Sequence, residues 1–156
     1  MKKNNKTLNW ESTDVNPALK KLNSLIGDWE ITGSHPLILN PITGKINFRW
    51  FNGKSFLIMQ TDFEKSGPPN STAIIGSDDS GEKLSMLYFD ERGVSRIYEV
   101  KFNDNILQMW RDFPGFSQRF TGNIKDEGNI IEGIWELCED NVNWNKDLET
   151  TYTRIK

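Results

Sequence analysis

The 156-residue sequence has little of the side-chain chemistry that metal and redox sites need. Cys138 is its only cysteine and His35 its only histidine. A single cysteine excludes an intramolecular disulfide, a multi-cysteine zinc site and a redox-active cysteine pair. A single histidine excludes the metal motifs that require two. We therefore expect no metal and no other cofactor.

The sequence also lacks a strong charge and long apolar runs. Its net charge is −3, and its 19 Lys and Arg are spread along the chain, which argues against nucleic acid as a partner. The longest apolar runs, 56–59 and 86–89, fall far short of the ~18 residues that cross a bilayer. No apolar segment of a signal peptide follows the basic first residues. We expect a soluble, cytoplasmic protein without membrane partners and leave its oligomeric state open.

Aromatic residues are abundant: the chain has six Trp, nine Phe and three Tyr. Each large ring can bury roughly 150–250 Å², so aromatic burial is expected to dominate the core. The length suits one compact domain. We predict a flexible N-terminus over residues 1–13, whose Trp10 can dock on the body, and a single domain over residues 14–156.

The hydrophobic pattern predicts one short helix followed by strands. Asp14 or Asn16 before Pro17 is typical of a helix start, and a helical apolar stripe then runs to Gly27. From Gly27 onward the period is two, and nine turn-rich breaks separate ten candidate strands, with all six prolines expected in the helix start or the breaks. The spacing predicts a mainly β protein, an antiparallel up-and-down barrel of about ten strands with one short N-terminal helix. The stripe consists of Leu19, Leu22, Leu25 and Ile26, and the breaks are 35–44, 52–53, 67–70, 80–81, 92–93, 103–105, 114–115, 127–129 and 140–143.

Strand alternation places Arg96 on one face with Val94, Tyr98, Val100 and Phe102. If that face is the inner one, a guanidinium among apolar neighbours requires a partner. An internal carboxylate such as Asp90 or Glu136 is the more common arrangement, and an acidic ligand is the alternative.

Other strands show a similar mixture of large rings and single polar groups. Gln118 lies among aromatics, where it either binds a ligand or satisfies backbone groups, and Trp144 shares a face with Leu148 in the last strand. Such faces are typical of a small-molecule cavity and equally of a filled aromatic core. His35 is expected to be exposed in the first long loop, and no catalytic residue is assigned. The candidate ligand-binding residues are Trp50, Arg96, Tyr98, Gln118, Arg119, Phe120, Trp135 and Tyr152.

Two segments carry a resemblance to a known superfamily. Leu25-Ile26-Gly27-Asp28-Trp29 resembles the opening of the calycins, which comprise the lipocalins and their bacterial relatives, and Tyr152-Thr153-Arg154 resembles their closing strand. The resemblance implies that Trp29 plugs one end of the barrel and that Arg154 stacks on its ring, both in structural roles. Segments 113–122, 133–136 and 144–154 further resemble small bacterial lipocalin-like proteins of uncharacterised function, so that the likeness covers about residues 19–155.

Two better-known families of similar barrels bind their ligands through residues that this sequence does not have in the required places. Nitrobindin-like barrels hold haem through a histidine near the C-terminus, and this chain has none after His35. Fatty-acid-binding proteins use an Arg-x-Tyr order, which Tyr152-Thr153-Arg154 reverses. We predict the binding of a small, mostly apolar ligand with an acidic or carbonyl end facing Arg96 or Arg119. The alternatives are an isomerase or hydrolase that uses pocket carboxylates, and a filled barrel that serves as a protein-interaction module.

Overall fold

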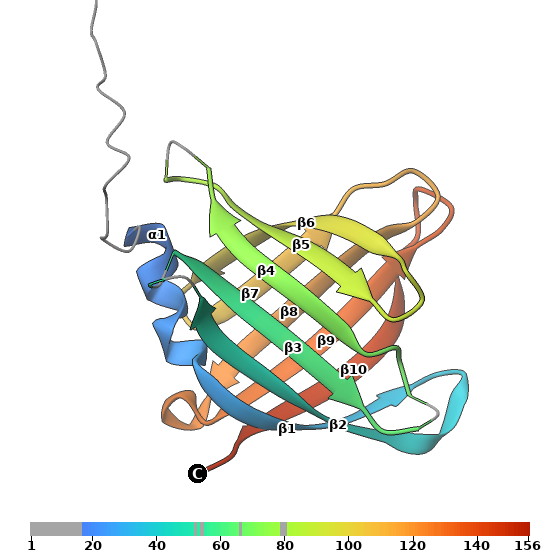
Figure 1. Ribbon diagram of the computed structural model, residues 1–156. Helices are drawn as coiled ribbons and strands as arrows, with labels where there is room; N and C mark the ends of the chain where they lie inside the picture. The colour runs from blue at the N-terminus through green and yellow to red at the C-terminus, as the bar shows by residue number, and fades with distance from the viewer. Residues whose placement is uncertain (1–16, 52, 54, 66, 79–80) are drawn as a thin grey trace, which may run out of the picture.

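The structure is a computed structural model that describes residues 17–51, 53, 55–65, 67–78 and 81–156. The predicted flexible segment 1–13, with Trp10, and the helix-start candidates Asp14 and Asn16 lie outside these residues. Ten antiparallel strands pair in sequence order, and β1 pairs with β10, so that the sheet closes into a barrel (Figure 1). This confirms the predicted fold class. Among the described residues, no helix has the length and apolar character needed to cross a membrane.

The strands follow one short helical segment at the start of the described chain. That segment consists of α1 (Pro17–Lys20) and the 3₁₀ turn η1 (Lys21–Leu25), and a second 3₁₀ turn, η2 (Asp126–Gly128), lies between β8 and β9. The strands are β1 (Gly27–His35), β2 (Ile38–Phe51), β3 (Phe56–Phe63), β4 (Ser71–Ser77), β5 (Leu84–Asp90), β6 (Ser95–Asn103), β7 (Ile106–Arg111), β8 (Ser117–Lys125), β9 (Ile130–Cys138) and β10 (Asn145–Arg154).

The first predicted break, 35–44, is wrong. Only Pro36 and Leu37 separate β1 from β2, so Pro41 lies inside a strand, against the expectation for prolines. The β1–β2 register shifts between Gly33 and His35, and the pairing of β2 with β3 begins at Gly44. Pro41 therefore lies within a bulge of β2 on the side of β1 and precedes the first residue of β2 that pairs with β3. Its missing N–H removes no ladder hydrogen bond there.

The helical segment lies across one end of the barrel (Figure 1). Leu19, Leu22 and Leu25 are buried, as the apolar stripe predicted, although the second half of the segment is 3₁₀ rather than α. Nε1 of Trp50 donates to Oδ1 of Asn23 in η1 at 3.1 Å. Side-chain burial and this hydrogen bond together close this end of the barrel.

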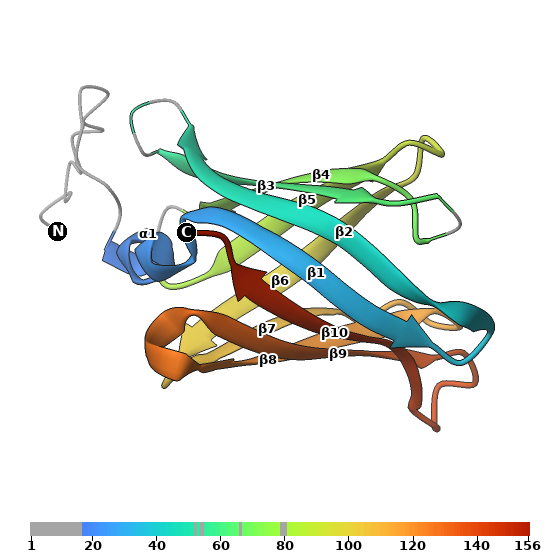
Figure 2. The same cartoon turned by 90° about the horizontal axis from the view of Figure 1, so that it is seen from below.

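Trp29 and Arg154 complete the closed end. Trp29 is fully buried, and its Nε1 donates to the carbonyl of Leu25 at 2.9 Å. The Arg154 guanidinium lies 4.1 Å from the centre of the Trp29 ring and donates to the carbonyls of Ile26 (2.7 Å) and Gly128 (3.2 Å). Figure 2 shows the end of β10 beside α1. Arg154 thus joins the helical segment, the η2 turn and the barrel, and leaves the other end of the barrel to form a site.

Candidate ligand-binding cavity

A cavity of about 370 Å³ lies inside the barrel at the end away from α1. The turns after odd-numbered strands all lie at that end, because β1 starts beside the helix and the strands alternate in direction. Residues of these turns, including Pro68, Arg92 and Phe116, line its mouth. Its inner wall is mostly apolar and includes Ile46, Met59, Phe63, Met86, Met109 and Leu148.

Arg96 of β6 is the central polar residue of this cavity. Its Nη1 donates to Oε1 of Gln118 at 3.2 Å, and the Tyr98 hydroxyl donates to the same oxygen at 2.8 Å. Because a guanidinium has no acceptor, the Gln118 carbonyl must face Arg96. The guanidinium also lies 5.1 Å from the Phe116 ring centre. The structure thus brings together three predicted residues on β6 and β8.

The expected internal carboxylate for Arg96 is absent. Asp90 accepts from Arg92 Nη2 at 2.8 Å and from the Tyr88 hydroxyl at 2.9 Å. Glu136 pairs with another arginine on the outer face. Within the described part of the chain, no carboxylate forms an ion pair with Arg96. The prediction of an internal pair with Asp90 or Glu136 is therefore wrong.

The groups around Arg96 have protonation states that leave its charge uncompensated. Burial, followed by the hydrogen bond to Asp90, raises the pKa of Tyr88 to about 12. The hydrogen bond from Arg92 lowers the pKa of Asp90 to about 2, so this carboxylate is ionised and matched to Arg92 at neutral pH. Burial raises the pKa of Tyr98, and the charge of Arg96 opposes that shift. Neutral tyrosines therefore surround a charged Arg96.

Arg119 lies on the opposite face of the wall from Gln118 and Phe120. Its Nε donates to Oε1 of Glu136 at 2.8 Å, and its guanidinium lies 4.1 Å from the centre of the Trp144 ring. The structure does not bring Arg119 into the cavity. The register of β10 against β9 shifts between Lys146 and Glu149, and this shift exchanges the inner and outer faces for the residues that precede it. Trp144 therefore lies on the outer side of the barrel and not with Leu148.

Three predicted aromatic residues form a layer across the middle of the barrel. Phe120 lies 5.2 Å from Trp135 and 6.3 Å from Tyr152, measured between ring centres. A Cβ atom built on Gly133 would lie 2.4 Å from the Phe120 ring, so the glycine leaves room for this ring. The layer forms the floor of the cavity, with Trp135 and Tyr152 in its lining. Trp50 lies beyond it at the closed end.

Arg111 of β7, which the sequence reasoning missed, lies close to Gln118, the residue that accepts from Arg96 and Tyr98. Its cross-strand partner is Gln118, so the two side chains leave the sheet on the same face. The guanidinium lies 4.5 Å from the Phe113 ring centre, and no ion pair with a described carboxylate is formed. The alternation of Leu107, Met109 and Arg111 is the signal that could have identified it.

His35 lies at the mouth, where it lines the cavity instead of standing exposed in a loop. Its Nε2 lies 2.7 Å from Oδ1 of Asp147, and its Nδ1 accepts from the backbone N–H of Leu37 at 3.1 Å. Because Nδ1 is an acceptor, Nε2 carries the proton and donates to Asp147. Both ring nitrogens are occupied, so this imidazole links the turn after β1 to β10 and offers no free base.

Solved structures of other proteins share this architecture. The crystal structure of Rv2717c from M. tuberculosis matches with a TM-score of 0.62 at 15% identity, over 92% of this chain and 100% of that chain. The S-type phycobiliprotein lyase CPES from Guillardia theta matches with a TM-score of 0.60 at 8% identity, over 88% and 92%. No family model and no curated protein matches the sequence. At these identities the likeness shows the fold alone, a ten-strand barrel.

Proposed function

We propose that this protein binds a small, mostly apolar ligand inside the barrel, with an acidic or carbonyl end held at Arg96. The observation that carries the proposal is the Arg96 guanidinium, which faces the cavity without a carboxylate partner among the described residues. Removing a charge from water is costly unless a counter-charge or hydrogen bonds compensate it. An anionic ligand end supplies both.

The surrounding groups support an oriented ligand. The cavity volume of about 370 Å³ suits a small molecule, and its apolar inner wall suits a hydrocarbon body. The Gln118 carbonyl, which also accepts from the Tyr98 hydroxyl, holds Nη1 of Arg96 and leaves the other donors of the guanidinium for the ligand. In this proposal the chain is a lipocalin-like binding protein, as its Gly27-x-Trp29 opening implies. The lyase among its structural neighbours makes a bilin-type ligand one member of the class to test.

A displacement assay tests this function. The full chain is loaded with cis-parinaric acid, and dodecanoate and dodecanol compete for the site. The Arg96→Gln substitution is expected to weaken the affinity for dodecanoate about 10- to 100-fold, which corresponds to the loss of one charge-assisted hydrogen bond. It should change the affinity for dodecanol little. Arg119→Gln, on the outer face, is the matched control and should leave both ligands unchanged.

Two outcomes contradict the proposal. The absence of probe uptake by the unmodified protein, together with a homogeneous unliganded mass after purification from its own host, would favour a filled barrel. Equal dodecanoate affinity in the Arg96→Gln variant and the unmodified protein would remove the arginine from the site.

A further inference from the structure

The barrel wall opens beside Arg96, where β6 and β7 separate. Their pairing ends at Glu99 opposite Trp110, although β6 starts four residues earlier, at Ser95. The two-residue turn at Asp104 and Asn105 determines which β6 residues direct their backbone groups to β7. Every second residue of β6 before the turn directs its N–H and C=O toward β7, and Ile97 belongs to this set. No residue of β7 pairs with Ile97. We call this gap between β6 and β7 the slot and define it by residues 95–98 of β6, the last β7 residue Arg111, and residues 112–113.

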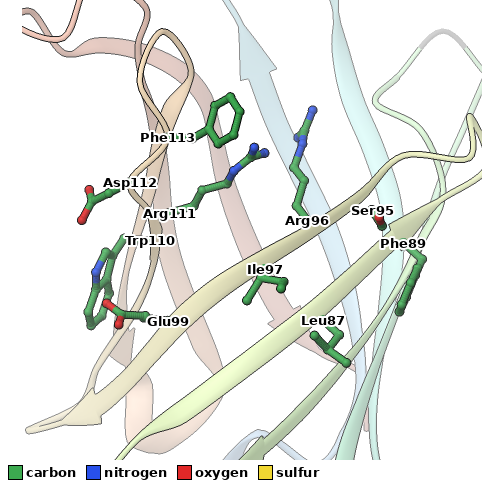
Figure 3. Close-up of a pocket in the computed structure, with 10 residues that line it drawn as sticks. All are labelled: Leu87, Phe89, Ser95, Arg96, Ile97, Glu99, Trp110, Arg111, Asp112 and Phe113. Atoms are coloured by element: carbon green, nitrogen blue, oxygen red, sulfur yellow. The ribbon is translucent and has the colours of Figure 1, made fainter.

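A groove of about 630 Å³ runs along the outside of the slot (Figure 3). Its lining is half apolar and half polar or charged, with Glu99 and Asp112 among the charged residues, and Arg96 belongs to it as well as to the lining of the inner cavity. The slot is therefore the place where the interior of the barrel and the outer surface approach each other, with a guanidinium between them. The apolar residues of the groove are Leu87, Phe89, Ile97, Trp110 and Phe113.

A second guanidinium converges on the slot. Figure 3 shows the Arg111 side chain extending from the end of β7 toward Arg96, whereas Asp112 and Glu99 point away. Arg111 is the cross-strand partner of Gln118, the residue that accepts a hydrogen bond from Arg96. Both arginines are thus neighbours of Gln118, Arg96 through a hydrogen bond and Arg111 as the facing residue of the next strand.

The charges near the slot do not cancel. Asp90 is already matched to Arg92, and Asp147 accepts from His35 at the mouth. Arg96 and Arg111 each form no ion pair with a described carboxylate. Glu99 and Asp112 line the same groove, but neither forms an ion pair with Arg96 or Arg111. Two guanidinium groups without a carboxylate partner among the described residues therefore lie at the slot, in a protein whose net charge is −3. One monocarboxylate would neutralise only half of that charge.

We propose that the slot holds the phosphate monoester head group of an amphipathic ligand between Arg96 and Arg111, with the apolar tail in the inner cavity. This inference rests on the proposed function and specifies its ligand class. A phosphate monoester carries about −1.5 to −2 charges at pH 7 and offers three acceptor oxygens. Guanidinium groups bind such oxygens in pairs, so two arginines can share one head group. A carboxylate has only two oxygens and a single charge.

Four ligands with the same twelve-carbon tail test the head group: dodecyl phosphate, dodecyl sulfate, dodecanoate and dodecanol. Each displaces cis-parinaric acid from the full chain below its micelle concentration. At pH 7.5 we expect dodecyl phosphate to bind about tenfold or more tightly than the sulfate or the carboxylate. Inorganic phosphate is expected not to compete, because it has no tail. Equal displacement by inorganic phosphate and dodecyl phosphate would overturn the proposal in favour of a free-anion site.

The pH dependence separates a dianion from a monoanion. The second phosphate pKa lies near 6, so the affinity for dodecyl phosphate should fall between pH 7.5 and pH 5 as the dianionic head group takes up one proton and becomes a monoanion. Dodecyl sulfate keeps its charge throughout and reports any effect of the protein's own groups. These groups are His35 with Asp147 at the mouth, Asp90, Arg92, Tyr88 and Tyr98 around the slot, and Glu99 and Asp112 in the groove. A parallel decline for both ligands would contradict the proposal.

Arg111→Gln is the decisive variant. It should abolish the preference for phosphate over carboxylate, whereas dodecanoate still binds through Arg96. Arg111→Lys, which keeps the charge, should retain part of the preference, and Arg119→Gln should retain all of it. An unchanged preference in the Arg111→Gln variant would overturn the inference and leave the proposed function intact. Failure of all four ligands to bind the unmodified protein would overturn both.

Discussion

The two ends of the barrel each contain an arginine beside aromatic rings, and their surroundings differ. At the closed end, Arg154 lies on the Trp29 ring and donates to backbone carbonyls of Ile26 and Gly128. At the open end, the described residues supply Arg96 with one acceptor, the Gln118 carbonyl. The same side chain therefore stabilises the fold where the protein supplies its acceptors. It becomes a candidate ligand contact where the protein does not.

The largest effect is expected from the plug of the closed end. Trp29→Ala removes a fully buried ring and should lower the free energy of unfolding by about 3–5 kcal/mol in urea titrations. Trp144→Ala, which removes the ring stacked on Arg119 outside the barrel, is the control and should cost much less. Equal losses for the two variants would contradict the structural role of Trp29.

The two arginines can be compared directly. The Arg154→Gln substitution should lower the free energy of unfolding by about 2 kcal/mol, since it removes hydrogen bonds from a charged donor and the contact with the Trp29 ring. Arg96→Gln should leave the stability of the unliganded protein unchanged or raise it slightly, because an uncompensated charge is removed. The same concentration of dodecanoate should stabilise the unmodified protein more than the Arg96→Gln variant. A large loss from Arg96→Gln without ligand would remove the distinction between the two ends.

The aromatic layer between the ends is sensitive to a single methyl group. Gly133→Ala should destabilise the protein by about 1–2 kcal/mol, because the new Cβ meets the buried Phe120 ring. Gly76→Ala is the matched control, since its Cβ would make only an ordinary contact with Phe56. Thermal unfolding of both variants measures the difference, and a neutral Gly133→Ala variant would show that the layer can rearrange.

The smallest effect concerns acid stability at the open end. The pKa of Asp90 is lowered to about 2 by its partners, so its stabilising contribution is complete above the ordinary pKa of 3.8 and is lost as the pH falls toward 2. The loss should be on the order of 1 kcal/mol. Asp90→Asn should flatten the stability profile between pH 4 and pH 2, whereas Asp112→Asn should not. An identical slope in the Asp90→Asn variant and the unmodified protein would argue against the Asp90–Arg92 pair.

Several features of the site could be predicted from the chain. The alternation around Arg96, Tyr98 and Gln118 placed their side chains on the face that lines the cavity. The same alternation places Arg119 outside, beside Gln118 and Phe120 in the opposite direction. Its inclusion among the ligand contacts came from its charge, and the alternation rule would have argued against it.

Other features depend on partners that are distant in sequence. Asp90 binds Arg92 across its own turn, so it is not available to Arg96, and a register shift near Lys146 moves Trp144 to the outer side. The β6–β7 pairing ends early and so opens the slot, and the hydrophobic pattern of the sequence does not predict where it ends. Each of these features is a choice between competing partners, and a choice of that kind is made only when the chain is folded.

The amino-acid sequence was sufficient for the ten-strand order, the helical cap and the shared face of Arg96 and Tyr98, because period-two alternation and turn chemistry are local properties. Only the closed barrel decided that this face points inward. The absence of a carboxylate at Arg96, the convergence of Arg111 on Gln118 and the opening in the wall came from the packed barrel. Strand register and bulges determine which side chains meet, and they depend on both strands of a pair at once.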